Sequence, residues 1–104
     1  MKATLIATCL LLAAANAAAS EVVVSLKNIA FSVKTLDVRV GDKVTFLNED
    51  PVRHNVYSPT EPDSFDLGAY ATGQSRSVSF QAEGEHEVKC SIHVNMKLTI
   101  TVKK

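Results

Sequence analysis

The stretch Cys90-Ser-Ile-His93-Val-Asn-Met96 places a thiol, an imidazole and a thioether within seven residues. Before it, His86, Val88 and Cys90 alternate with polar residues, and alternation resumes at Leu98. A period of two is typical of strands with one buried face, so the stretch is predicted to be a tight loop between two strands. Sulfur and imidazole donors suit copper, and the loop therefore predicts a metal site.

A fourth candidate donor lies far upstream, where His54 follows another strand pattern. Together with Cys90, His93 and Met96 it makes one thiolate, two imidazoles and a thioether, the ligand set of a blue-copper electron-transfer site. Zinc also accepts Cys and two His, but zinc sites do not call for a thioether. A lone Met is more often a gap-filler than a ligand, and the position of Met96 in this loop favours axial ligation.

These segments resemble the cupredoxins, the small blue-copper family of plastocyanin and pseudoazurin, and within it amicyanin and the related proteins of methylamine utilization. Cys-x-x-His-x-x-Met at 90–96 is similar to the short ligand loop of amicyanin. Val40-Gly-Asp-Lys-Val-Thr-Phe-Leu-Asn48, with His54 after it, resembles the first-ligand region of the family. Gly84-Glu-His-Glu-Val-Lys-Cys90 resembles the strand that leads into the ligand loop, and the match runs from about residue 31 to residue 102.

The resemblance implies a cupredoxin fold and one mononuclear copper ion on His54, Cys90, His93 and Met96. It also implies that the side chain of Asn55 ties the first-ligand segment to the loop that begins at Cys90, which would steady the thiolate. His86 lies on the same predicted face as Cys90, where the family often has an aromatic residue. We therefore expect His86 to be a packed, hydrogen-bonded structural histidine.

The N-terminus resembles a secretory signal peptide. Lys2 gives a positive start, Ala3 to Ala15 an apolar run, and small-residue cleavage sites follow at Ala17 and Ala19. The run is shorter than the ~20 residues that span a bilayer. We expect residues 1–19 to be removed and residues 20–104 to form one exported, periplasmic domain without membrane insertion. Cys90 is then the single cysteine left, so no internal disulfide forms despite an oxidizing compartment.

Several short strands are predicted, without helical periodicity. Two alternating runs flank Gly41-Asp42 and predict a hairpin at that turn. The Pro- and Gly-rich segment from Ser58 to Gly73 is expected to be a long connection that Phe65 and Leu67 pin to the core. The succession predicts an all-β fold, a small Greek-key cupredoxin-like sandwich or barrel. The expected strand segments are 22–26, 36–40, 44–48, 77–80, 86–90 and 98–102.

Composition narrows the classes of function. The chain has 11 Lys and Arg against 11 Asp and Glu, with neither sign in a long block, which argues against nucleic acid as a partner. It carries no Ser-His-Asp signature, phosphate-binding glycine loop or helical zinc motif, so we do not expect an enzyme.

We expect an exported monomer that carries one electron between redox partner proteins through a single copper site. From the resemblance, the electron port is the imidazole of His93, with Ile92 and Val94 as candidates for its apolar rim. A protein that captures, buffers or delivers copper needs the same four ligands. That alternative stays open at the level of the sequence.

Overall fold

The computed structural model describes residues 19–104, which form eight β-strands and no helix. The predicted signal peptide therefore lies, except for Ala19, outside the described residues. Nothing helical in residues 19–104 has the length and apolarity needed to cross a bilayer. The strands are β1 (Glu21–Leu26), β2 (Thr35–Arg39), β3 (Lys43–Asn48), β4 (His54–Ser58), β5 (Phe65–Tyr70), β6 (Ser75–Ser79), β7 (Gly84–Lys89) and β8 (Lys97–Lys103).

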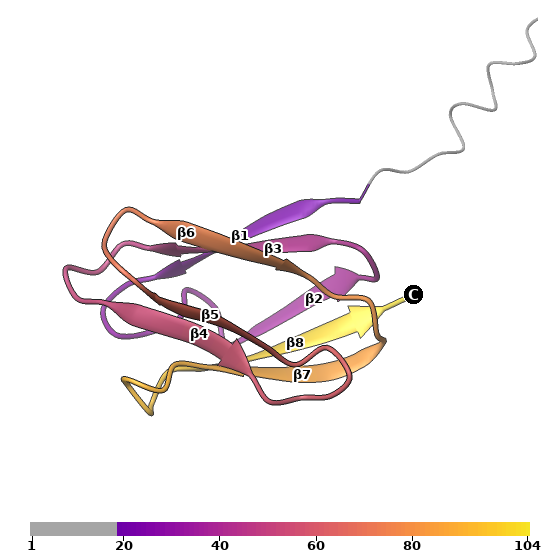
Figure 1. The fold of residues 1–104 in the computed structure, drawn as a ribbon. Helices are drawn as coiled ribbons and strands as arrows, with labels where there is room; N and C mark the ends of the chain where they lie inside the picture. The colour runs from indigo at the N-terminus through magenta and orange to yellow at the C-terminus, as the bar shows by residue number, and fades with distance from the viewer. Residues whose placement is uncertain (1–18) are drawn as a thin grey trace, which may run out of the picture.

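The strands form two sheets that face each other as a sandwich (Figure 1). One sheet has the order β1-β3-β6 and the other the order β2-β8-β7-β4-β5. β1 runs parallel to β3, and β2 runs parallel to β8, whereas the remaining neighbours are antiparallel. The prediction of an all-β cupredoxin-like sandwich is confirmed.

The core lies between the sheets because side chains alternate along each strand and one face of each sheet turns inward. β8 illustrates this, since Leu98, Ile100 and Val102 are buried while Lys97 and Lys103 are exposed. Phe31 and Phe46 meet edge to face at 6.2 Å, and Phe65 meets Phe80 at 5.9 Å. Phe65 and Leu67 pack against this core, as predicted from the sequence.

The predicted hairpin at Gly41-Asp42 is wrong. β2 and β3 flank this turn, but they belong to different sheets, so the turn carries the chain from one layer to the other. Gly41 has a φ of 91°, which favours glycine, and its N–H donates to the carbonyl of Phe80. Alternation shows which face of a strand is buried, but two strands of opposite layers show the same alternation as a hairpin pair.

The segment from Ser58 to Gly73 also differs from the prediction, because it contains β5. This strand pairs antiparallel with β4 at the edge of the larger sheet, and the register shifts between Asn55 and Tyr57. Gly68 and Asp66 hide the strand pattern, since edge strands tolerate polar residues and irregular register.

Three loops, among them the one that carries Cys90 and His93, lie at one end of the sandwich. The β3–β4 loop (49–53), the β7–β8 loop (90–96) and the β1–β2 loop (27–34) all follow strand ends there, at the left in Figure 1. The turn at Gly41 and the start of β1 lie at the opposite end. The sandwich therefore brings His54 beside the Cys90 loop although 36 residues separate them in the chain.

Candidate metal centre

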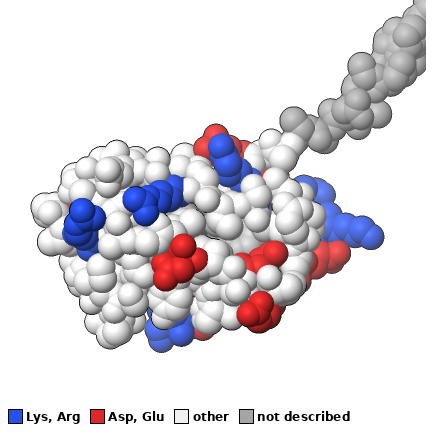
Figure 2. Space-filling model, viewed as in Figure 1, with Lys and Arg blue, Asp and Glu red and all other residues white. Residues whose placement is uncertain are grey.

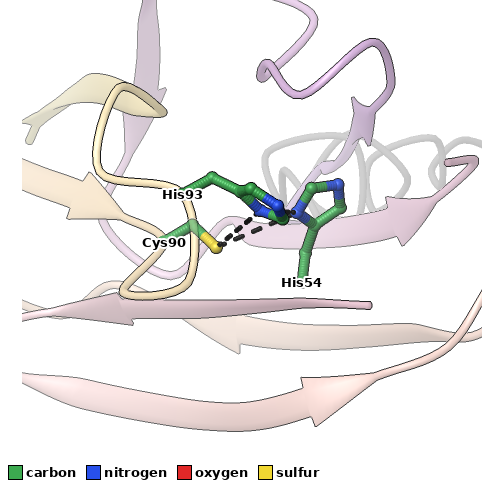
Figure 3. A group of neighbouring side chains, drawn as sticks. All are labelled: His54, Cys90 and His93. Atoms are coloured by element: carbon green, nitrogen blue, oxygen red, sulfur yellow. Dashed lines mark hydrogen bonds between the residues drawn. The ribbon is translucent and has the colours of Figure 1, made fainter. Parts of the chain in front are cut away.

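Three of the four predicted ligand side chains point at one another (Figure 3). The Sγ atom of Cys90 is 3.9 Å from Nδ1 of His54 and 3.9 Å from Nδ1 of His93, and the two Nδ1 atoms are 3.1 Å apart. His54 comes from the first position of β4, whereas Cys90 and His93 come from the β7–β8 loop. The sandwich thus brings together donors from two distant segments.

The spacing of these atoms fits a metal ion. In a triangle with sides of 3.9, 3.9 and 3.1 Å, the point equidistant from all three atoms lies about 2.1 Å from each. Metal bonds to imidazole nitrogen and thiolate sulfur measure about 2.0–2.3 Å. Within residues 19–104, this is the single cluster of His, Cys and carboxylate donors with such spacing. Distances alone suit copper and zinc equally, so the choice between them rests on the donor types and on similarity to known proteins.

Met96 lies in the same loop and is buried. Its backbone N–H donates to the carbonyl of His93 at 3.0 Å, which closes the loop into a tight turn directly before β8. The predicted loop from Cys90 to Met96 is therefore found between β7 and β8. Met96 thus combines a buried side chain with a backbone position fixed relative to His93.

His54 is completely buried, and a carboxylate holds its far side. Nε2 of His54 lies 2.6 Å from Oδ2 of Asp50, which is itself 4% exposed. An ionised carboxylate accepts hydrogen bonds and donates none, so Nε2 carries the proton and Nδ1 presents its lone pair toward Cys90 and His93. A metal-binding histidine is commonly oriented through its second nitrogen in this way.

Asp50 also fastens a third loop to the site. Its carboxylate accepts the backbone N–H groups of Asn28 and Ile29 at 2.6 and 2.9 Å. Both residues have positive φ, 57° and 55°, which is rare for a β-branched residue such as Ile29. Two successive N–H groups in this conformation form an anion-binding nest, so the carboxylate stabilises a backbone that would otherwise be strained.

Burial raises the pKa of Asp50, but the hydrogen bonds from His54, Ile29 and Asn28 outweigh it and hold the pKa below its usual value. The side chain is therefore ionised at neutral pH and places one negative charge behind His54. A buried charge of this kind acts on anything bound at Nδ1 of the same ring.

The loop that carries Asp50 is braced by a fully buried amide, Asn48. Its Nδ2 donates to the carbonyls of Val52 and Tyr70, both at 2.9 Å, and its Oδ1 accepts the N–H of Asp50 at 2.9 Å. The hydroxyl of Thr72 donates to the carbonyl of Asp50. All hydrogen-bonding groups of the Asn48 amide are thus used to fix the backbone before His54.

Asn55 joins the two ligand segments, as predicted. Its Oδ1 accepts the N–H of Ser91 at 2.7 Å and the hydroxyl of Ser91 at 3.0 Å. Because Asn55 follows His54 and Ser91 follows Cys90, these two bonds tie the imidazole and the thiolate positions to each other across 36 residues of sequence.

The two imidazoles have different surroundings. His54 is enclosed, whereas His93 is partly exposed and lies between Ile92 and Val94, which are 50% and 75% exposed. The predicted apolar rim is therefore present at the surface beside His93. A charged or polar side chain at position 92 or 94 would hold water at the surface beside His93, but Ile92 and Val94 are both aliphatic.

His86 is not part of the cluster. Its Nε2 donates to the carbonyl of Ala82 at 2.9 Å, and its ring packs against Phe80 at 5.0 Å in the core. Its Nδ1 is buried and has no hydrogen-bond partner among residues 19–104. The prediction of a packed, hydrogen-bonded histidine is confirmed.

A buried phenol completes the surroundings of the site. Tyr70 pairs with His54 across β4 and β5, and its hydroxyl donates to the carbonyl of Phe46 at 2.9 Å. Burial, opposed by the nearby charge of Arg76, raises the pKa of Tyr70 to about 12. Tyr70 therefore stays neutral and serves as a hydrogen-bonded wall of the site.

Comparison with known proteins agrees with this geometry. A family model described as copper binding proteins of the plastocyanin/azurin family matches residues 18–103. No curated protein sequence matches the chain significantly.

Solved structures share the fold. A copper-containing nitrite reductase from Thermus scotoductus SA-01 is 29% identical with a TM-score of 0.75, over 81% of this chain and 22% of that enzyme. This chain therefore resembles about a fifth of the enzyme. A reduced amicyanin variant and the Cu(I) form of another are each 26% identical with a TM-score of 0.75, over 86% of this chain and 89% of theirs.

Proposed function

Because the chain belongs to the plastocyanin/azurin family of copper-binding proteins, we propose that it is an exported blue-copper protein that carries one electron between redox partners. The proposed ligands are His54, Cys90, His93 and Met96. The observation that carries the proposal is the triangle of two Nδ1 atoms and one Sγ, with one imidazole locked inside and the other partly exposed.

A bound copper ion supplies a one-electron couple between Cu(I) and Cu(II), and the protein supplies the geometry. Cys90 binds as a thiolate, since a coordinated cation holds the sulfur deprotonated. Asp50 fixes the tautomer and the angle of the His54 ring, and Asn55 fixes the position of Ser91 next to Cys90. A ligand set held this firmly rearranges little when the charge at its centre changes, which keeps the barrier to electron transfer low.

His93 is the proposed port for electrons. It is the one imidazole of the cluster with exposed surface, and the exposed aliphatic side chains of Ile92 and Val94 form an apolar rim that a partner can cover. Figure 2 shows charged side chains of both signs scattered over the viewed face, without a large patch of one sign. Partner recognition through a small apolar contact suits an encounter that must be brief.

The same anchoring favours a carrier over a protein that hands copper on. Release of copper requires ligands that swing away, but His54 is held by the buried Asp50, and the bonds between Asn55 and Ser91 hold the chain next to Cys90. We therefore place capture, buffering or delivery of copper second. The activity of the nitrite reductase is not assigned to this chain, which resembles 22% of that enzyme.

The proposed location follows from the predicted signal peptide and is the periplasm, with residues 20–104 acting as a monomer. Redox proteins are the proposed partners.

The first experiment loads the protein with Cu(II) and records its visible spectrum. We expect one copper per chain and an intense thiolate-to-copper charge-transfer band that Cys90→Ser abolishes. His86→Phe serves as the matched control, because it alters a buried histidine outside the cluster and is expected to keep the band. Stoichiometric zinc binding without such a band in copper would overturn the assignment.

The second experiment measures electron self-exchange between oxidized and reduced protein. Val94→Asp puts a charge on the proposed port and is expected to slow exchange while leaving the spectrum unchanged. Val23→Asp is the control, since Val23 is 56% exposed on β1, in the sheet that carries none of the proposed ligands. Slow exchange in the unaltered protein, together with rapid transfer of copper to a competing apo-protein, would favour copper delivery instead.

A further inference from the structure

Ser20 is the first residue of the described chain whose backbone is hydrogen bonded within the fold. Its N–H donates to Oδ1 of Asp42 at 2.8 Å, and its carbonyl accepts the N–H of Lys43 at 2.9 Å. β1 begins at the next residue and pairs with β3 from Glu21 opposite Lys43 onward. Among residues 19–104, backbone hydrogen bonding to the rest of the domain therefore starts at the nitrogen atom of Ser20.

The acceptor of that N–H is a carboxylate with a specific place in the fold. Asp42 is 8% exposed, and its second oxygen accepts the N–H of Arg39 at 2.9 Å. These hydrogen bonds from Arg39 and Ser20 hold the pKa of Asp42 below its usual value in spite of burial. One oxygen of an ionised carboxylate is thus directed at the backbone nitrogen of Ser20.

Lys104 also lines the depression beside Asp42, and the charge of Arg39 acts on the Asp42 carboxylate, but two of the nearby cations make their direct contacts elsewhere. The guanidinium of Arg39 donates to the carbonyl of Lys104 at 3.1 Å, and the ammonium of Lys103 lies 3.4 Å from the carboxylate of Asp37. A depression of about 470 Å³ opens beside Ser20 and Asp42, so a group larger than a peptide N–H has room there. Figure 1 places this region at the end of the sandwich away from the metal site.

We propose that the peptide bond between Ala19 and Ser20 is the processing site, and that cleavage turns the Ser20–Asp42 hydrogen bond into an ion pair that locks β1 onto β3. This inference rests on the proposed export of the chain. A signal-cleaving peptidase adds water across the bond, which leaves a carboxylate on Ala19 and an ammonium on Ser20, without any change in oxidation state. The residues before the bond, Ala17-Ala-Ala19, fit the small-residue rule for such cleavage.

The alternative cleavage after Ala17 would place the new charge on Ala18, two residues before the nitrogen that Asp42 holds. The Ser20 nitrogen would then remain a neutral amide. An ammonium at Ser20 adds to the existing hydrogen bond the Coulomb attraction between two opposite charges, which a neutral amide lacks. β1 is an edge strand, bonded to β3 alone in its sheet, so a stronger bond at its first residue limits fraying.

The first test is the intact mass of the protein exported from the full-length chain. We expect residues 20–104. A mature chain that begins at Ala18 would overturn this inference and leave export standing, whereas a full-length chain without cleavage would overturn export as well. The visible copper band is expected to be the same in every form, because the metal site lies at the other end of the sandwich. Failure of the copper assignment is thereby separated from failure of the processing site.

The second test compares the thermal unfolding of the Ser20 form with that of a form that begins at Ala18. Both contain all eight strands and the whole core. We expect the Ser20 form to melt about 2–5 °C higher, and Asp42→Asn to remove the difference. Asp37→Asn, an exposed carboxylate in the same region, is the control and should leave it in place. Equal melting temperatures in the unaltered sequence would overturn the ion pair, whether or not Asp42→Asn folds.

Discussion

Replacing Asp50 with Asn tests the account of the metal site most directly, because it removes one buried charge and nearly keeps the shape. The carboxylate now accepts three hydrogen bonds, from His54, Asn28 and Ile29. An amide offers a single oxygen, and its NH2 group meets at least one of these donors. Asp50→Asn should therefore loosen the β1–β2 loop and release the His54 ring from its fixed angle.

The magnitude follows from the distance. Oδ2 lies 2.6 Å from Nε2 of His54, and the ring plus one metal–nitrogen bond of about 2 Å puts the charge about 6 Å from a metal on Nδ1. At an effective dielectric constant of about 20, a unit charge at that distance contributes about 3 kcal/mol. At about 2.3 kcal/mol per 100 mV, this corresponds to about 120 mV. Because the negative charge favours Cu(II), its removal should raise the reduction potential by that order.

The assay is the reduction potential of copper-loaded Asp50→Asn, measured beside Glu49→Gln. Glu49 is the neighbouring carboxylate, but it is exposed, so water screens its charge and the potential should change little. Urea unfolding of the apo-protein gives a second measurement that needs no metal. Asp50→Asn leaves buried N–H groups without an acceptor, so its free energy of unfolding should be lower by about 1–3 kcal/mol.

A potential for Asp50→Asn within about 20 mV of the unaltered protein would refute the electrostatic role of Asp50, since the estimate above is several times larger. Equal shifts in Asp50→Asn and Glu49→Gln would refute the argument from burial.

Three further predictions concern substitutions of Met96, Asn55 and Asp42, which lie in separate parts of the protein. Met96→Leu should keep copper and raise the potential, because a weak axial ligand tunes the potential whereas short bonds hold the metal; an unchanged spectrum and potential would make Met96 a packing residue. Asn55→Ala should lower stability by about 1–3 kcal/mol in urea unfolding, with Asn55→Asp as the control that keeps an acceptor for Ser91. The pKa of Asp42 is lowered by folding, so its contribution to stability is present above about pH 4 and lost as the pH falls through the folded value. The stability gap between the unaltered protein and Asp42→Asn should accordingly be constant near neutral pH and narrow as the pH falls below about 4.

Strand faces were predictable from the sequence, whereas strand partners were not. The alternation in 44–48 indicated correctly which side chains are buried. In 36–40 it was correct for Val38, whereas Leu36 is half-buried and Val40 is exposed. The strand partners differ from the prediction, since β2 pairs with β8 and β3 pairs with β1 and β6. The cause is physical. An inward-facing residue of either sheet meets the same core, so its hydrophobicity does not record the sheet from which it points.

The ligand loop was predictable because its donors are local. Cys90, His93 and Met96 fall within one turn, and few reasons other than a metal bring these residue types together. Asp50 was missed because Asn48-Glu-Asp-Pro51 has the composition of an ordinary turn. The one signal that could have revealed it is the spacing of four residues to His54, which becomes informative only when the loop geometry is known.

The two imidazoles show why a site of this kind needs a fold rather than a motif. A loop of seven residues can place Cys90, His93 and Met96, but loops move, and a donor set on one loop would move with it. His54 enters from β4 in the interior, with Asp50 behind its ring and Asn55 bonded to Ser91 of the loop. The interior histidine thus acts as the fixed reference against which the loop is held. His93 is then free to lie at the surface beside Ile92 and Val94, because the rigidity of the site does not depend on its burial. Substitutions that weaken the anchoring of His54 should accordingly change the reduction potential and the free energy of unfolding. Substitutions of Ile92 or Val94 should change the rate of electron self-exchange alone.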